Sequence, residues 1–202
     1  VGCVGKDKYA EKLIEANKKV GLRAVYRYDE EQPTGRCGVI ITGHDRSMCT
    51  DLAAANCYKV EHLKENWDLV KQANIYFVGG YHLTVSVPAI MALAEEAAAE
   101  NKTFMLSLSA PFICQFFKDQ LDQTSPYWDY VVGNETEARA FGAAHDLNTE
   151  DIPTIAKYMA NLPKKNTQRK RTVIITQGTE PTVIAVQGDD DVKTFPVHVI
   201  SK

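Results

Sequence analysis

The chain has 202 residues, of which 45% are hydrophobic and 24% are charged, and its formal net charge at pH 7 is −3. This length fits one or two domains with a sizeable core, and the near balance of charge argues against a general affinity for nucleic acid or for an anionic membrane surface. No apolar run approaches the roughly 20 residues that a membrane-spanning helix needs.

The first part of the chain predicts a helix followed by a β-hairpin. The opening residues resemble the end of a strand inside a fold, so we expect further residues before Val1. Apolar residues near helical spacing predict a helix over 7–20. Residues 22–28 alternate with the period of a strand, a Pro-Thr-Gly turn follows at 33–35, and a second short strand is predicted at 37–42. We expect these two strands to pair as a hairpin.

From residue 60 onward, predicted helices alternate with buried apolar strands. The helices are expected near 60–72, at 88–100, from Pro111, from Asn134 and near 152–161, and the strands at 75–78, 104–108, 130–133, 173–176, 182–187 and 193–199. Such alternation is typical of βαβ units and of a parallel sheet covered on both faces. The predicted fold class is therefore α/β, a doubly wound and mostly parallel sheet with a hairpin insertion.

Ligands of such sheets bind beyond the carboxyl ends of the strands. The segments expected there are Gly80-Tyr81, Ser109-Ala110-Pro111, Gly133-Asn134 and Thr176-Gln177-Gly178. Common phosphate-binding and hydrolase motifs are absent, since the sequence contains no G-x-x-x-x-G-K-[ST], G-x-G-x-x-G or G-x-S-x-G. The histidines show no zinc-type spacing either. If the protein handles nucleotides, it binds phosphate in another way.

Asn134 and Glu137 stand three residues apart after a predicted strand, on one face of a helix. A carboxylate beside an amide at this point would hold the hydrated magnesium of a nucleoside triphosphate, because magnesium keeps several of its waters. The same spacing is that of a capping box, in which the two side chains only close the helix start. Spacing alone leaves both interpretations open.

Three further features each have two interpretations. Thr176-Gln177-Gly178 ends a strand, where the glycine would let backbone amides approach a phosphate or would simply make a turn. Arg46 lies just beyond the hairpin, either as a surface side chain or as a cation for a transferring phosphoryl group. Tyr81 and Phe112 follow strand ends, where they would either sandwich a nucleobase or belong to the core.

Two features of the composition are interpreted without a binding site. A basic run between residues 164 and 171 is interpreted as a solvated loop, with a phosphate or nucleic-acid patch as the alternative. The cysteines form no C-x-x-C pair, which argues against a disulfide framework or a zinc site and favours reduced thiols in the cytosol. The five cysteines are Cys3, Cys37, Cys49, Cys57 and Cys114.

The order of the motifs resembles that of eukaryotic adenosine kinases. The segments that carry the resemblance are residues 32–37 (Gln-Pro-Thr-Gly-Arg-Cys), 42–47, 51–58 (Asp-Leu-Ala-Ala-Ala-Asn-Cys-Tyr), 83–86, 108–112 (Leu-Ser-Ala-Pro-Phe), 133–138 (Gly-Asn-Glu-Thr-Glu-Ala) and 176–178. The Ala-Ala-Ala-Asn-Cys-Tyr and Asn-Glu-Thr-Glu-Ala segments are highly specific in combination. The resemblance runs in order along the whole chain.

This resemblance implies a ribokinase-like fold with a small β-lid, and transfer of the γ-phosphoryl group of ATP to the 5′-hydroxyl of adenosine, giving AMP. It implies a role for each matching residue. Tyr81 stacks on adenine, Phe112 is a second pocket aromatic, Cys37, Met48 and Leu52 line the lid and pocket, Arg46 lies near the transferring phosphate, Asn134, Thr176 and Gly178 bind ATP, and Glu137 holds Mg²⁺ through water. The implied partners are adenosine and ATP, with neither nucleic acid nor membrane.

The resemblance also implies a division into residues 1–21 of the large domain, a lid at 22–50, and the incomplete large nucleoside- and ATP-binding domain at 51–202. The family's Asp-Thr-Asn-Gly-Ala-Gly-Asp motif, which supplies the catalytic aspartate and the anion hole, does not occur before Lys202. We expect a monomer in the cytoplasm, with the nucleus as a second location. The alternatives are a sugar kinase of the same fold and a non-catalytic nucleoside-binding protein.

Overall fold

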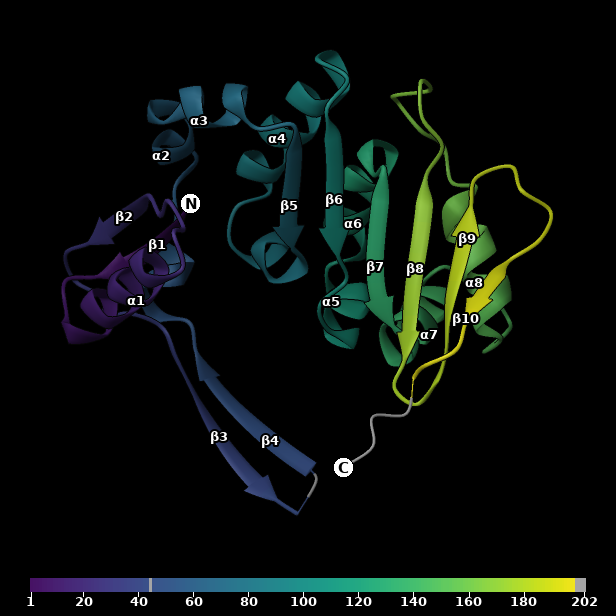
Figure 1. The fold of residues 1–202 in the computed structure, drawn as a ribbon, viewed down its shortest axis with the longest axis horizontal. Helices are drawn as coiled ribbons and strands as arrows, with labels where there is room; N and C mark the ends of the chain where they lie inside the picture. The colour runs from purple at the N-terminus through teal and green to yellow at the C-terminus, as the bar shows by residue number, and fades with distance from the viewer. Residues whose placement is uncertain (44, 199–202) are drawn as a thin grey trace. The chain divides into compact units, whose positions relative to one another are not determined.

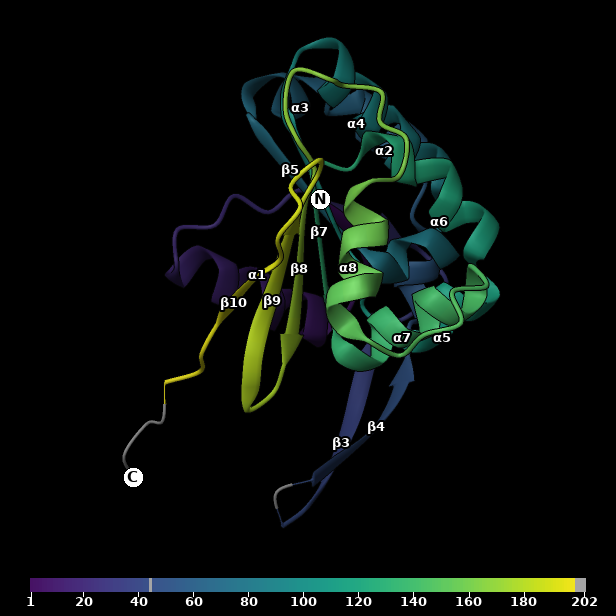
Figure 2. The same cartoon turned by 90° about the vertical axis from the view of Figure 1, so that its right-hand side faces the viewer.

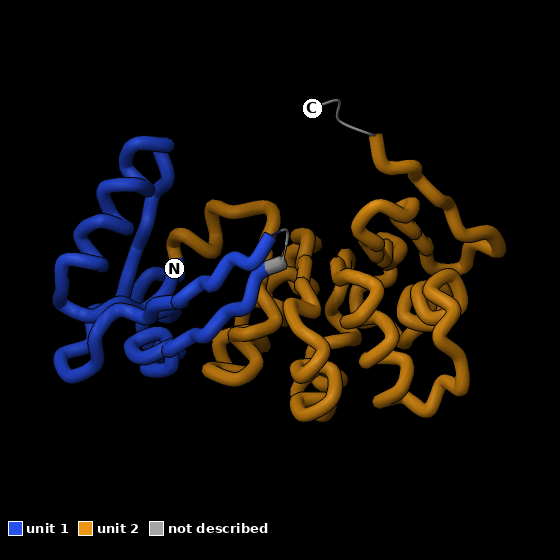
Figure 3. Tube along the Cα trace, turned by 90° about the horizontal axis from the view of Figure 1, so that it is seen from below, with its two compact units in different colours: residues 1–67 blue, residues 68–202 orange. Residues whose placement is uncertain are grey.

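The computed structural model describes residues 1–43 and 45–198 (Figure 1). It divides into two compact units, Val1–Trp67 and Asp68–Lys202, which are coloured separately in Figure 3. The elements of the first unit are β1 (Gly2–Gly5), α1 (Lys8–Lys19), β2 (Tyr26–Asp29), β3 (Arg36–Thr42), β4 (Asp45–Asp51), the 3₁₀ helix η1 (Ala53–Cys57) and α2 (Val60–Glu65). A further helix, α3 (Trp67–Gln72), spans the boundary, so the helix predicted at 60–72 is two helices.

The start of α1 is held by Asp7. Its carboxylate caps the helix by accepting hydrogen bonds from the backbone N–H groups of Tyr9 and Ala10, both at 3.0 Å. The same carboxylate accepts the N–H and the hydroxyl of Thr34, each at 2.8 Å. These bonds, with that of the Thr34 N–H foremost, lower the pKa of Asp7 to about 2. One side chain therefore joins the helix start to a segment 27 residues away.

The prediction that the strand at 22–28 pairs with the strand at 37–42 was wrong. β2 pairs in parallel with β1, and β3 pairs in antiparallel fashion with β4. The Pro-Thr-Gly segment does not reverse the chain as a hairpin turn, because Thr34 is bound to Asp7 and the neighbouring Gln32 carbonyl packs directly on Gly5. The hairpin turns instead at Gly43, whose φ of +63° suits glycine.

The second unit contains a six-stranded sheet with the order β10-β9-β8-β7-β6-β5. Its strands are β5 (Ile75–Gly79), β6 (Thr103–Ser107), β7 (Tyr130–Asn134), β8 (Thr172–Gln177), β9 (Glu180–Val186) and β10 (Lys193–Phe195). β5 to β8 are parallel, whereas β9 and β10 are antiparallel to their neighbours. The predicted mostly parallel α/β fold is confirmed. The end of the strand predicted at 193–199 lies outside the described residues.

The helices of the second unit lie on one face of this sheet (Figure 2). They are α4 (Val87–Ala99), α5 (Pro111–Phe116), α6 (Lys118–Thr124), α7 (Glu135–Ala144) and α8 (Ile152–Ala160), with the 3₁₀ helices η2 (Gly80–Thr84) and η3 (Ser125–Tyr127). Strand order advances in one direction from β5 to β8, so right-handed crossovers place every helix on the same side. Ile75 and Phe77, which point to the other face, are 64% and 62% exposed. The sequence predicted helices on both faces of the sheet, whereas the described residues of this unit place helices on one face.

The basic run was predicted to be a solvated loop, and this was wrong for two of its residues. The side chain of Lys164 is buried and lies 2.6 Å from the buried carboxylate of Asp129. Arg171 is fully buried, and burial lowers its pKa to about 10, so it stays charged at neutral pH. Its guanidinium donates hydrogen bonds to the carbonyl oxygens of Ser125, Trp128, Met159, Leu162 and Pro163. Burial of Lys164 and Arg171 is tolerated because the first is paired with a carboxylate and the second is hydrogen-bonded to carbonyl oxygens.

Arg171→Met should lower the free energy of unfolding by roughly 3–5 kcal/mol, because it leaves a set of buried carbonyl oxygens without their donor. Urea denaturation of the chain measures this. Arg139→Met is the control, since Arg139 is exposed on α7 and its replacement should change stability by no more than about 0.5 kcal/mol. Equal losses in the two variants would contradict a stabilising role for Arg171.

Candidate active site

The four parallel strands of the second unit end at one edge of its sheet (Figure 1). In open α/β sheets this edge binds ligands. The predicted residues of this unit lie there: Tyr81 follows β5, Phe112 follows β6, Asn134 ends β7, and Thr176 is the last residue but one of β8. The second unit therefore brings its predicted site residues to a single edge.

Tyr81 and Phe112 form an exposed aromatic pair. Their ring centroids are 5.8 Å apart with an angle of 59° between the planes, and Phe117 lies 6.4 Å beyond Phe112. Tyr81 is 46% and Phe112 is 38% exposed, which disfavours the core interpretation. At this separation the two rings contact each other. A planar ligand would lie against the open side of the pair, not between the rings, so the sandwich form of the prediction does not fit this structure.

Asn134 and Glu137 form the capping box that their spacing indicates. The Asn134 amide oxygen accepts the Glu137 N–H at 2.8 Å, and Glu137 Oε2 accepts the Asn134 N–H at 3.0 Å. Glu137 is buried, and this burial raises the pKa of its carboxyl group. A Cβ on Gly133 would lie 3.1 Å from Oε2, so a glycine makes room for the carboxylate. The cap engages Oε2 alone.

The side chains at this edge determine what kind of metal ion could bind there. Within the described residues, no group of three or more His, Cys, Asp or Glu side chains is placed to hold a metal ion. One buried carboxylate beside an amide oxygen suits a hydrated Mg²⁺ held through water, since this ion keeps most of its waters and takes few protein ligands. The residues present therefore fit a magnesium ion held through water.

Thr176 and Gly178 lie at the end of β8. Thr176 is the register partner of Asn134 on the neighbouring strand, and its hydroxyl donates to the Gly133 carbonyl at 3.4 Å. Gly178 has a φ of +60° in the tight turn to β9, and a Cβ there would meet open space. The turn interpretation of Gly178 is confirmed, and the open space leaves its backbone accessible to a phosphate.

The hairpin of the first unit carries three predicted residues on one face. Cross-strand pairing joins Cys37 to Thr50, Val39 to Met48 and Ile41 to Arg46. Paired residues share a face, and alternate pairs share the same face, so Cys37, Met48 and Arg46 point to one side. The Thr50 hydroxyl lies 3.1 Å from the Cys37 sulfur.

Leu52 is not part of this hairpin face. It follows β4 and is partly buried, and its carbonyl oxygen would lie 2.6 Å from a Cβ on Gly35. The close approach of two backbone segments here explains the glycine at position 35.

Ser109 lies at a strand end that the sequence predicted to face ligands, but no role was predicted for its side chain. Ser109 has a left-handed backbone, with φ of +66°, and its hydroxyl accepts the Gly80 N–H at 2.8 Å. The Ser-Ala-Pro segment was recognised as a strand end, but a positive φ at a serine has no local sequence signal.

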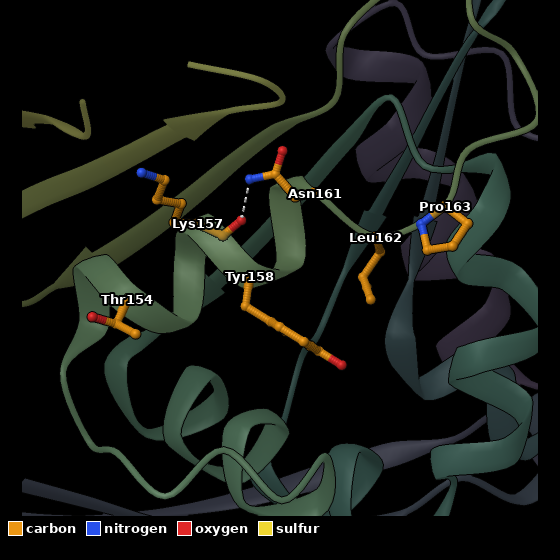
Figure 4. A pocket seen from close by; sticks show the side chains of 6 residues that line it. All are labelled: Thr154, Lys157, Tyr158, Asn161, Leu162 and Pro163. Carbon is orange, nitrogen blue, oxygen red and sulfur yellow. Dashed lines mark hydrogen bonds between the residues drawn. The ribbon is translucent and has the colours of Figure 1, made fainter. Parts of the chain in front are cut away.

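A separate surface hollow of about 450 Å³ lies beside α8 (Figure 4). It is lined by Thr154, Lys157, Tyr158, Asn161, Leu162 and Pro163. The Asn161 amide donates to the Lys157 carbonyl at 2.8 Å, which closes the helix end. No carboxyl end of a parallel strand contributes to this hollow, so we do not place the active site there.

The family profile described as "pfkB family carbohydrate kinase" matches residues 1–201. The chain belongs to the pfkB family. Among curated members, "Adenosine kinase 1" of Arabidopsis thaliana is 49% identical over 204 residues, which cover 100% of this chain and 59% of that protein. The predicted resemblance to the adenosine kinases of this family is thus confirmed.

Two solved kinase structures are similar to this chain. Anopheles gambiae adenosine kinase, in complex with P1,P4-di(adenosine-5) tetraphosphate, matches with a TM-score of 0.97 at 44% identity, over 99% of this chain and 59% of that one. Ribokinase of Thermotoga maritima matches with a TM-score of 0.77 at 18% identity, over 98% and 59%, which shows the predicted ribokinase-like fold. The chain spans 59% of the length of these relatives. Among its described helices, none is long and apolar enough to cross a membrane.

Glu137→Gln should leave the stability at pH 7 unchanged or raised, because glutamine still accepts the Asn134 N–H and removes a buried charge. Burial raises the folded-state pKa of Glu137, so wild-type stability should fall as the pH rises through that pKa, and the variant should lack this dependence. Urea denaturation between pH 4 and pH 7 measures both effects.

Glu137→Ala is the control, and losing the cap should cost it roughly 0.5–2 kcal/mol. If glutamine destabilised as much as alanine across this pH range, the carboxylate would be doing more than capping the folded chain.

Proposed function

We propose that the protein is an adenosine kinase, which transfers the γ-phosphoryl group of ATP to the 5′-hydroxyl of adenosine and releases AMP and ADP. The observation that carries the proposal is the exposed Tyr81–Phe112 pair at the carboxyl edge of the sheet, in a chain whose similar proteins are adenosine kinases. The ligand of the mosquito relative, a tetraphosphate with adenosine at both ends, suits an enzyme that takes two adenosine-containing substrates.

At the nucleoside end, aromatic rings supply the chemistry. Adenine has a flat apolar face, and the open side of the Tyr81–Phe112 pair offers a surface on which it would stack. Cys37, Met48 and Leu52 would contribute apolar contacts, with the hairpin serving as the lid that the resemblance implies. Arg46, on the same hairpin face, would supply positive charge for the transferring group.

At the phosphate end, Asn134, Thr176 and the open backbone at Gly178 would bind ATP. Mg²⁺ bound to the triphosphate would neutralise charge during transfer, and Glu137 would hold it through water. The 5′-oxygen attacks the γ-phosphorus, the bond to the bridging β–γ oxygen breaks, and ADP leaves. A base must take the hydroxyl proton; the aspartate implied for this role belongs to a motif that the 202 residues do not contain.

A sugar kinase is the second candidate, because the family as a whole is described as carbohydrate kinases. The two candidates differ in the role of the aromatic pair, because adenosine has a flat base that stacks on the rings and a sugar has none. A monomeric state and a cytoplasmic and nuclear location remain predictions.

Tyr81→Ala and Phe112→Ala should each weaken adenosine binding by roughly 1–3 kcal/mol, the range measured for stacking of a base on an aromatic side chain. Isothermal titration with adenosine measures this, and ribose serves as the competing sugar. Phe116→Ala is the matched control, because Phe116 lies on the same helix and is 77% exposed, and its loss should leave affinity unchanged. Tighter binding of ribose than of adenosine would favour the sugar kinase.

The 202 residues by themselves should form no AMP from adenosine and ATP, whereas the longer relative, "Adenosine kinase 1" of Arabidopsis thaliana, serves as the active control. A missing base and a missing anion hole each remove roughly 10²–10⁴-fold in rate. Quantifying AMP for both proteins is the measurement. Turnover by the shorter chain near that of the longer one would show that an acid within these residues is the base.

A further inference from the structure

Ser109 occupies a backbone conformation that serine rarely adopts. It lies between the end of β6 and the start of α5, with φ of +66°. The Ala110 N–H donates to the Leu108 carbonyl at 2.8 Å, which closes a γ-turn centred on Ser109. A positive φ at the centre marks the rarer and more strained of the two γ-turn forms. Glycine would adopt this turn without strain, so the serine is explained by what its side chain does.

The Ser109 hydroxyl joins the ends of two neighbouring strands. Its oxygen accepts the Gly80 N–H at 2.8 Å, just past the last register pair of β5 and β6, Gly79 and Ser107. The hydroxyl hydrogen has acceptors in the Ser107 carbonyl at 3.3 Å and the Ser107 hydroxyl at 3.2 Å. The Ser109 side chain thus accepts a backbone N–H just past the end of β5 and donates its own hydrogen at the end of β6.

Gly80 fits closely against the same turn. A Cβ at this position would lie 2.5 Å from the Ser107 carbonyl oxygen and 2.7 Å from that of Leu108. No larger residue would allow this approach without a shift of the backbone. The hydroxyl bond and the close packing together hold the first residue of η2 against the segment that leads into α5.

Both aromatic rings of the candidate site are attached to this junction. Tyr81 is the residue after Gly80, and Phe112 is three residues after Ser109, at the second position of α5. The 5.8 Å separation of the rings therefore depends on how the two strand ends are joined. We infer that Ser109 is a positioning residue for nucleobase binding, whose hydroxyl holds Tyr81 and Phe112 at the spacing that the base requires. This inference rests on the proposed function.

A purely structural role would give a different pattern in two variants. Ser109→Gly removes the hydroxyl and relieves the turn, whereas Ser109→Ala removes the hydroxyl and keeps the strained φ. The two should therefore differ in thermal stability, with glycine the more stable. Both lose the bond to Gly80, so both should bind adenosine more weakly by the same factor, roughly 3- to 10-fold for one hydrogen bond. A structural role predicts instead that affinity follows stability.

The experiment compares wild type, Ser109→Gly, Ser109→Ala and Ser109→Asn. Asparagine tolerates the left-handed region and carries an acceptor, so it should recover part of the affinity. Three quantities are measured for each: adenosine affinity by titration calorimetry, melting temperature, and the NMR cross-relaxation between the Tyr81 and Phe112 rings. Thr84→Ala is the control, because its hydroxyl donates a hydrogen bond within η2, to the Tyr81 carbonyl at 2.9 Å.

Equal loss of affinity in the glycine and alanine variants, with weakened ring-to-ring signal, supports the inference. Wild-type affinity or an unchanged ring signal in Ser109→Gly overturns it. If wild type itself binds no adenosine, the proposed function fails, and the ring signal still decides whether Ser109 positions the pair. An equal effect of Thr84→Ala would show that any hydroxyl of this turn matters alike, and would also overturn the inference.

Discussion

One buried guanidinium joins several segments of the second unit. Arg171 lies just before β8, and its guanidinium joins η3, the end of α8 and the loop that follows α8 to the sheet. The pair of Asp129 and Lys164 lies beside it, and Asp129 also accepts the Phe104 N–H at the start of β6. These contacts gather where β6, β7 and β8 begin. Charges buried with full partners resist rearrangement, because any displacement leaves a donor or acceptor unsatisfied.

The candidate site lies at the opposite ends of the same strands. Tyr81, Ser109, Asn134 and Thr176 lie at or just past the carboxyl ends of β5 to β8, whereas the charged network lies where β6 to β8 begin. The buried charged network and the candidate site therefore lie at opposite ends of the strands. At the site edge, aromatic side chains remain partly exposed for a ligand.

Much of this architecture was predictable from the sequence, for identifiable reasons. Short apolar runs such as 75–78 and 130–133 favour strands, and all four parallel strands of the second unit were predicted. The hairpin was misassigned because every residue of β3 is exposed, so burial imposes no alternation there, and because the side chain that captures Thr34 is 27 residues away. Lys164 and Arg171 appeared solvated because their partners are backbone carbonyls and a distant aspartate, which composition does not reveal.

Among the site residues, too, some features were predictable from the sequence and others were not. Spacing placed Asn134 and Glu137 on one helix face, and the structure shows the cap, whereas the metal role still rests on resemblance. Ser109 was placed at a strand end from the sequence, but its bond to Gly80 could not be predicted, because that partner is 29 residues away.

The register of the hairpin also makes it a natural place for thiol chemistry. Cys37 faces the side of Arg46 and Met48, and Cys49, paired with Gly38, faces the other side. Both are exposed, whereas Cys3 and Cys114 are buried, and burial raises the pKa of Cys114 to about 12. A maleimide dye would therefore react first with the hairpin, and with one of its two cysteines replaced by serine it would mark a single chosen face. The sequence thus carries one attachment site for a probe on each face of the hairpin.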